Sequence, residues 1–213
     1  MAELSHLTAD EQLTYWIGAA ARNDEHVSAR IRMMIDELNR MLPHDHRATA
    51  GNNYSRRQEL AKVLLGKLPT LAFIAIPDDA VELGRRILGD SKVVHERRNW
   101  LVHSIWASAE NEASYEFVVA HMLMGNWERP EAPETLDALK ALAPLQIRDL
   151  TRLGFFTQSL TMRSVIAANI HAGIEDGDES CVLLLRAYEA MARGEFDIEA
   201  DGRLRPRDPA HFA

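Results

Sequence analysis

Residues 91–106 have the sequence SKVVHERRNWLVHSIW, and this stretch indicates both the fold and the chemistry of the chain. Positions four, three and four residues apart share one stripe of a helix, and here they are Val94, Arg98, Leu101 and Ile105. The apolar stripe therefore contains a guanidinium group. Burying a guanidinium is costly unless a carboxylate, carbonyl groups or a bound anion pairs with it. We therefore expect Arg98 either to have a partner inside the protein or to receive one from a ligand.

The neighbouring face of the same predicted helix carries three polar side chains and a tryptophan: His95, Asn99, His103 and Trp106. A purely structural helix leaves the positions of its second face free to vary. The recurrence of imidazole and amide groups at helical spacing therefore makes this face the first candidate for a functional site.

The run from Arg98 to His103 has the pattern Arg-Asn-x-x-x-His. It resembles the signature of the HEPN superfamily (higher eukaryotes and prokaryotes nucleotide-binding), in which an arginine and a polar residue precede a histidine by a short spacer. The motif match covers residues 98–103, and the rest of the resemblance lies in the mostly helical pattern of the chain. The resemblance implies a HEPN-like helical bundle. It also implies either a metal-independent endoribonuclease or a non-catalytic relative that binds a nucleotide, RNA or a protein.

Cleavage of RNA without a metal ion needs a group that moves a proton near neutral pH, and an imidazole suits this task. We assign that role to His103. The reaction also needs a fixed positive charge on the scissile phosphate, which a guanidinium matches in geometry, and we assign it to Arg98. Asn99 lies one turn before His103 and is expected to orient the imidazole or to contact the phosphate. This mechanism involves no metal and no cofactor.

Three further residues are predicted to bind substrate, each with an alternative interpretation. Arg97 competes with Arg98 for the place of the motif arginine. His95 is either a second imidazole of the cleft or a solvated helix residue. Trp106 either stacks on a base or packs in the core beside a hairpin.

Arg98 and His103 are five positions apart, so they point roughly 140° apart around an ideal helix. They converge on one phosphate only if the arginine side chain curls along the helix, if the helix deforms, or if a second surface closes over it. The resemblance implies that two subunits pair around a shared cleft, so we expect a homodimer. It leaves open an antitoxin or nucleotidyltransferase partner and a role as a toxin or defence protein.

The composition is that of an ordinary globular protein, with 213 residues, 46% hydrophobic and 26% charged. The chain has no apolar run of membrane-spanning length and no signal-peptide pattern at its start, so we expect a cytoplasmic protein without a membrane partner. The net charge of −8 argues against a broad surface that binds polyanions irrespective of sequence. A protein that only mediates interactions through its apolar helix faces remains a third interpretation.

His44, Asp45 and His46 provide too few ligands for zinc, and Cys181 is expected to be a buried thiol.

The pattern along the chain predicts one helical-bundle domain at 1–194 and a C-terminal hairpin or loosely held tail at 195–213. Capping boxes are expected at Thr8–Glu11 and at Ser55–Gln58, and Pro69 is expected to end a helix. Gly89 is expected to end the helix before residue 91, and Gly194 the last helix. A turn at 110–112 and the alternation at Tyr115–Val119 predict a small β-hairpin after the motif helix. Residues 125–135 are expected to form a loop. Asp201-Gly202 predicts a second tight turn near the C-terminus.

Overall fold

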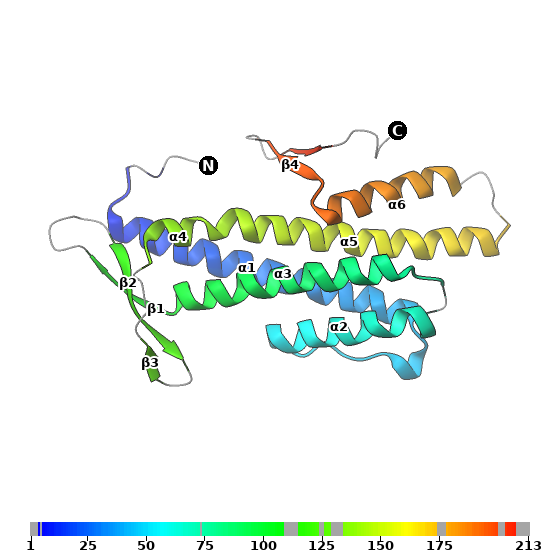
Figure 1. Cartoon of the computed structure of the whole chain (residues 1–213), viewed down its shortest axis with the longest axis horizontal. Coiled ribbons are helices and arrows are strands. Elements are labelled where there is room, and N and C mark those ends of the chain that lie inside the picture. Colours follow the sequence, from blue (N-terminus) through cyan, green and yellow to red (C-terminus); the bar gives the residue numbers. More distant parts are fainter. Residues whose placement is uncertain are drawn as a thin grey trace. The chain divides into compact units, whose positions relative to one another are not determined.

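A computed structural model describes residues 4, 6–72, 74–108, 115–123, 126–128, 134–173, 178–199 and 203–207. Helices make up most of this part of the chain (Figure 1): α1 (Ala9–Met41), α2 (Tyr54–Leu71), α3 (Asp78–Val102), α4 (Leu136–Lys140), α5 (Leu142–His171) and α6 (Asp178–Arg193), with a short 3-10 helix, η1 (His44–His46). The expected mostly α-helical fold is confirmed. None of the described helices is both long enough and apolar enough to cross a membrane.

The described chain separates into two compact units. Unit 1 comprises residues 1–26 and 91–147, and unit 2 comprises residues 27–90 and 148–213. The core of unit 1 is built on buried apolar residues of four helices: Ala20, Val94, Leu101, Leu136, Leu139 and Leu142. The larger core of unit 2 includes Ile31, Met34, Leu64, Ile87 and Phe156. Burial of these apolar faces stabilises each unit, as in a helical bundle. The division into a 1–194 domain and a 195–213 tail stays a prediction.

The capping box at the start of α1 is confirmed. The Thr8 N–H donates to Glu11 Oε2 at 2.8 Å, and the Glu11 N–H donates to Thr8 Oγ1 at 3.4 Å. These two hydrogen bonds satisfy N–H groups that the first turn of a helix leaves without an intrahelical acceptor.

The start and the end of α2 differ from the sequence-based expectation. Asn53 caps the helix, because its Oδ1 accepts the Ser55 N–H at 2.8 Å, so the capping box at Ser55–Gln58 is wrong. Gln58 is buried and donates to Leu88 O at 2.9 Å instead. Pro69 lies inside the last turn of α2 rather than beyond its end. Pro69 removes one backbone hydrogen bond of the helix, but the Ala72 N–H still closes the last turn on Leu68 O at 3.1 Å.

The predicted break at Gly89 is also wrong, because α3 runs without interruption from Asp78 to Val102. Asp90 and Ser91, the expected caps, have tertiary roles: Asp90 pairs with Arg152 at 2.6 Å, and Ser91 is buried. The helix ends earlier than expected at its other end. His103 is a turn residue, and Ile105 and Trp106 belong to a strand rather than to the helical stripes.

The expected β-hairpin after the motif helix is confirmed and is larger than predicted. Strands β1 (Ser104–Ser108), β2 (Tyr115–Leu123) and β3 (Asn126–Glu128) form an antiparallel sheet in the order β1-β2-β3 (Figure 1). The pairing of Ile105 with Ala120 and of Trp106 with Val118 gives the backbone after His103 a sheet partner, which explains why α3 stops there. β3 falls within the predicted 125–135 loop, so that loop is wrong over these residues.

A second antiparallel pair, β4 (Phe196–Ile198) and β5 (Leu204–Pro206), follows α6. Gly194 ends α6 as expected, with a φ of +84° that favours glycine. The predicted turns at 110–112 and at Asp201-Gly202 lie outside the described residues.

Candidate functional site

Four polar side chains of unit 1 are linked by consecutive hydrogen bonds, and we call them the polar chain: Asp24, His95, Asn99 and Arg98. Asp24 lies on α1, and the other three lie on the last two turns of α3. His95 and Asn99 are four residues apart, so they are stacked on one helix face. The sequence-based expectation that these two residues share a face is confirmed.

The hydrogen bonds of the polar chain all run in the same direction. Nη1 of Arg98 donates to Oδ1 of Asn99 at 2.7 Å, and Nδ2 of Asn99 donates to Nε2 of His95 at 3.0 Å. Nδ1 of His95 then donates to Asp24, with Oδ1 at 2.8 Å and Oδ2 at 3.0 Å. Nε2 accepts a hydrogen bond only in an imidazole that carries its single proton on Nδ1. The hydrogen bonds of the polar chain therefore fit a neutral His95 in the tautomer with its proton on Nδ1.

The polar chain is largely withdrawn from water at its Asp24 end. The side chains of His95 and Asp24 are 14% and 12% exposed. A buried carboxylate needs hydrogen-bond donors, and His95 provides one that reaches both oxygens. Asp24 and His95 therefore form a fixed base on which the amide of Asn99 is held.

Arg98 stands at the other end of the polar chain and is only partly satisfied. Its Nε is buried and has no hydrogen-bond partner among the described residues. Among the described residues, the Arg98 side chain donates one hydrogen bond, to the neutral amide of Asn99. No described carboxylate forms an ion pair with it. Among the described residues, the positive charge of Arg98 is thus held in position without a carboxylate that neutralises it, which suits it to an anion.

His103 is the first residue after α3 and is exposed. Its backbone N–H donates to Asn99 O at 3.1 Å, which continues the helical hydrogen-bond pattern by one residue. The structure thus links Arg98 to Asn99 and Asn99 to His95, and it places His103 one turn beyond Asn99 at the surface.

The three residues predicted to bind substrate have different surroundings. Arg97 forms an ion pair with Glu134. His95 lies within the polar chain. Trp106 packs against the core of unit 1, and its Nε1 donates to Leu101 O at 3.0 Å. A tryptophan held in this way has both its ring and its N–H engaged within the fold.

Asp24 is the member of the polar chain that was not predicted from the sequence. It is separated from His95 by 71 positions, so no local pattern connects them. One signal was present nonetheless. Asp24 is spaced four residues from the buried Ala20 and three from the buried Val27, so it is a carboxylate within an apolar stripe.

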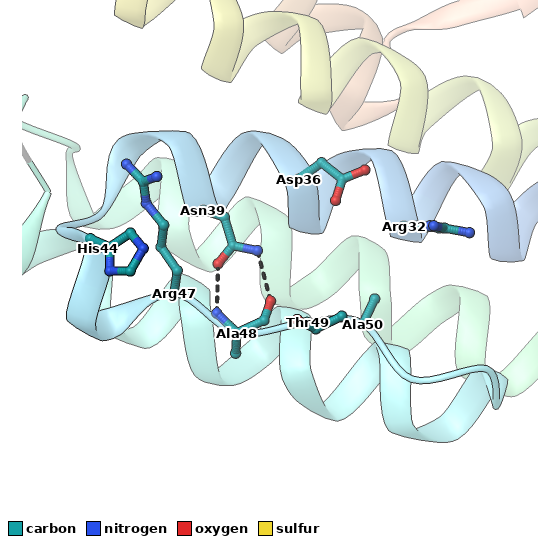
Figure 2. Close-up of a pocket in the computed structure, with 8 residues that line it drawn as sticks. All are labelled: Arg32, Asp36, Asn39, His44, Arg47, Ala48, Thr49 and Ala50. Carbon is teal, nitrogen blue, oxygen red and sulfur yellow. Dashed lines mark hydrogen bonds between the residues drawn. The ribbon is translucent and has the colours of Figure 1, made fainter.

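Unit 2 contains a separate concavity of about 340 Å³ between α1 and the segment that follows it (Figure 2). Arg32, Asp36 and Asn39 of α1 line one side, and His44 and residues 47–50 line the other. Figure 2 shows the amide of Asn39 clamping the backbone of Ala48, with Nδ2 2.8 Å from Ala48 O and Oδ1 3.0 Å from Ala48 N. Arg47 donates its Nε–H to Leu42 O at 3.0 Å. These contacts hold the segment against the helix, so Asn39 and Arg47 of this pocket already serve the fold.

Within the described part of the chain, no group of three or more His, Cys, Asp or Glu side chains is placed to hold a metal ion, and this includes His44, Asp45 and His46. The chemistry available in unit 1 is that of a fixed guanidinium, an amide, an imidazole within the polar chain and a second imidazole at the surface. Comparison with known proteins finds no matching family model, no matching curated protein and no matching solved structure.

Proposed function

We propose that this protein is a metal-independent endoribonuclease of HEPN type, with Arg98 and His103 as its catalytic residues. One observation carries the proposal: the Arg98 guanidinium is held by the neutral Asn99 amide, its buried Nε has no partner in the described chain, and no described carboxylate neutralises it. A purely structural buried arginine is normally paired with a carboxylate. A guanidinium that is held in a defined orientation, and that no described carboxylate neutralises, suits a phosphate.

In the proposed reaction, His103 accepts the proton of a ribose 2′-hydroxyl as that oxygen attacks the adjacent phosphorus. Arg98 stabilises the additional negative charge of the pentacoordinate transition state. The bond from phosphorus to the 5′-oxygen then breaks, and that oxygen takes up a proton. The products are a 2′,3′-cyclic phosphate and a 5′-hydroxyl end.

Asp24, His95 and Asn99 are positioning residues in this proposal. Asp24 holds the tautomer of His95, His95 accepts from the Asn99 amide, and this fixes which end of the amide faces Arg98. The reacting phosphate therefore meets a guanidinium whose orientation is set before it binds, which lowers the cost of reaching the transition state.

The proposed enzyme is a homodimer. Arg98 lies inside α3 and His103 follows its end, so the two side chains leave the helix in different directions. A second copy that presents the same motif would enclose the phosphate from the other side, as the resemblance to HEPN proteins implies.

A non-catalytic binding module of the same type is the second candidate. It is favoured by the exposure of His103, because a proton-transfer group acts best where water is excluded. In that case Arg98 binds the phosphate of a nucleotide or RNA, and no bond is cut.

The test is incubation of the purified full chain with a mixed-sequence RNA in EDTA, with analysis of the 3′ ends. We expect cleavage to persist in EDTA and to leave 2′,3′-cyclic phosphates. Arg98→Gln and His103→Ala should each lower the rate by about 100-fold or more. The matched controls are Arg22→Gln and His26→Ala, which remove the same groups from exposed positions of α1.

The outcomes of this test distinguish the proposed enzyme from the binding module. Cleavage that survives Arg98→Gln or His103→Ala, or that disappears with EDTA, contradicts the proposed enzyme. RNA binding that depends on Arg98 without any cleavage selects the binding module.

A further inference from the structure

Five arginines surround one concavity of unit 2, which we call the arginine pocket. Its volume is about 480 Å³, and its lining consists of Arg86, Arg148, Arg152, Arg193 and Arg207 together with Gly194 and Glu195. The arginines come from α3, α5, the end of α6 and the residue after β5. The cluster brings five guanidinium groups to one place on a protein whose net charge is −8.

The end of α6 gives the pocket its shape. Gly194 adopts a φ of +84°, and the Gly194 and Glu195 N–H groups donate to Met191 O at 3.0 Å and to Ala190 O at 3.1 Å. These bonds form a Schellman motif, which turns the chain sharply after the helix. The Arg207 N–H then donates to Glu195 O at 3.0 Å, which places Arg207 beside Glu195.

The carboxylates that pair with these arginines are mostly outside the pocket. Arg152 pairs with Asp90 at 2.6 Å, Arg207 with Asp197 at 3.1 Å and Arg148 with Asp149 at 3.4 Å, but none of these acids lines the pocket. Glu195, which pairs with Arg193 at 3.1 Å, is the one acidic residue among the described residues of the lining. Each ion pair uses only part of the donor capacity of a guanidinium. The acids therefore orient the arginines, and further N–H donors remain for a ligand.

Two arginines of the pocket are informative because their surroundings differ. Arg152 is only 6% exposed, and it is anchored by Asp90 and by a hydrogen bond from its Nε to Ala192 O at 2.9 Å. Arg86 is exposed on α3, and no ion pair joins it to another described residue. The pocket thus combines one fixed guanidinium with one that has no carboxylate partner in the described chain.

We propose that the arginine pocket binds a small anion with two adjacent phosphate groups, such as pyrophosphate or the diphosphate of a nucleotide. A guanidinium donates two parallel hydrogen bonds to a phosphate, so several arginines together match a ligand with several phosphate oxygens. The described residues of the lining include no aromatic or aliphatic side chain that would cover a base, so the proposed recognition is of the phosphates. All lining residues belong to unit 2, so the inference does not depend on the function proposed for the polar chain of unit 1.

The experiment is calorimetric titration of the purified full chain at low salt with pyrophosphate, inorganic phosphate, ADP, adenosine and citrate. We expect pyrophosphate and ADP to bind with affinities within about threefold of each other, and phosphate to bind about tenfold more weakly. Adenosine should not bind. Citrate tests for a general polyanion site, and binding of citrate as tight as that of pyrophosphate would overturn the proposal.

A pair of neighbouring substitutions provides the matched control. Arg86→Gln should weaken pyrophosphate binding about tenfold, and the double variant Arg86→Gln/Arg148→Gln should weaken it further. Arg85→Gln makes the same change one position earlier on α3. Arg85 pairs with Glu82 and lies outside the lining. The affinity of the Arg85→Gln variant for pyrophosphate should therefore stay within about twofold of that of the wild type.

The substituted residues Arg86, Arg148 and Arg85 are exposed, so the variants are expected to fold, and their melting temperatures should verify this. The proposal is overturned if the wild type does not bind pyrophosphate. It is equally overturned if Arg85→Gln weakens binding as much as Arg86→Gln, since the effect would then be one of overall charge.

Discussion

Asp24 of α1 and His95 of α3 are joined through one imidazole nitrogen, with His95 Nδ1 2.8 Å from Oδ1 and 3.0 Å from Oδ2 of the carboxylate. The same imidazole accepts the Asn99 amide on its other nitrogen at 3.0 Å. Removing the Asp24 charge therefore acts on Asn99 and Arg98 through His95, without touching either.

For the proposed ribonuclease, Asp24→Asn should reduce RNA cleavage by about tenfold through kcat, because the amide at position 24 no longer fixes the His95 tautomer that orients Asn99. KM should change little, since Asp24 is a positioning residue in this proposal and does not contact the proposed substrate. Steady-state kinetics of cleavage separates the two parameters. Glu25→Gln, at the adjacent exposed position, is the control and should leave both unchanged. An equal loss in both variants would remove Asp24 from the positioning role.

Two glycines of α3 should respond oppositely to alanine. A Cβ at Gly84 would lie 2.7 Å from Phe156 Cζ and 3.0 Å from Leu65 Cδ1, so Gly84→Ala should destabilise the protein by about 1–3 kcal/mol. A Cβ at Gly89 would meet nothing within 4 Å, so Gly89→Ala should stabilise it by up to about 1 kcal/mol. Urea unfolding measures both. Destabilisation by Gly89→Ala would show that α3 is interrupted at this point.

The buried Arg152 should be important for the stability of unit 2. Arg152→Met removes the donor to Asp90 and to Ala192 O, and it should lower the free energy of unfolding by about 3 kcal/mol. Asp90→Asn should cost less, since the Asp90 side chain is 42% exposed and water replaces its partner. Arg85→Met on the surface should change the unfolding free energy by about 0.5 kcal/mol or less. If Arg152→Met were as mild as Arg85→Met, the buried pair would have no stabilising role.

Asp149 should make stability depend on pH between about 4 and 6. Burial raises the pKa of its carboxyl from 3.8 to about 6, against the opposing effect of Arg148 and Arg152, and the charge of Asp90 adds to the rise. The folded state therefore binds the proton more tightly than the unfolded state. The resulting stabilisation is fully present below pH 3.8 and is lost as the pH rises through about 6.

Asp149→Asn removes this titration. Relative to the wild type, the Asp149→Asn variant should therefore gain unfolding free energy as the pH rises from 4 to 7.5, by up to about 3 kcal/mol. Urea unfolding at both pH values measures it. Glu82→Gln, with a 72% exposed side chain, is the control and should show a much smaller shift. A constant difference for Asp149→Asn would mean that its carboxyl titrates normally.

Features set by neighbours in the sequence were predictable. The reciprocal hydrogen bonds of Thr8 and Glu11, the end of α6 at Gly194 and the alternation that forms β2 each depend on a few consecutive residues. The shared face of His95 and Asn99 follows from helical spacing alone. The sequence also indicated that Arg98 lies where a charge needs a partner.

Only the tertiary structure decided the remaining features. α3 continues through Gly89, and Asp90, which was expected to cap a new helix, pairs instead with Arg152, 62 positions away. The end of α3 at Val102 depends on the pairing of β1 with β2. Asp24 joins His95, and five arginines from four parts of the chain surround one pocket. Each of these relationships depends on folding, which brings together side chains too far apart in the sequence to contact each other within a single helix or strand.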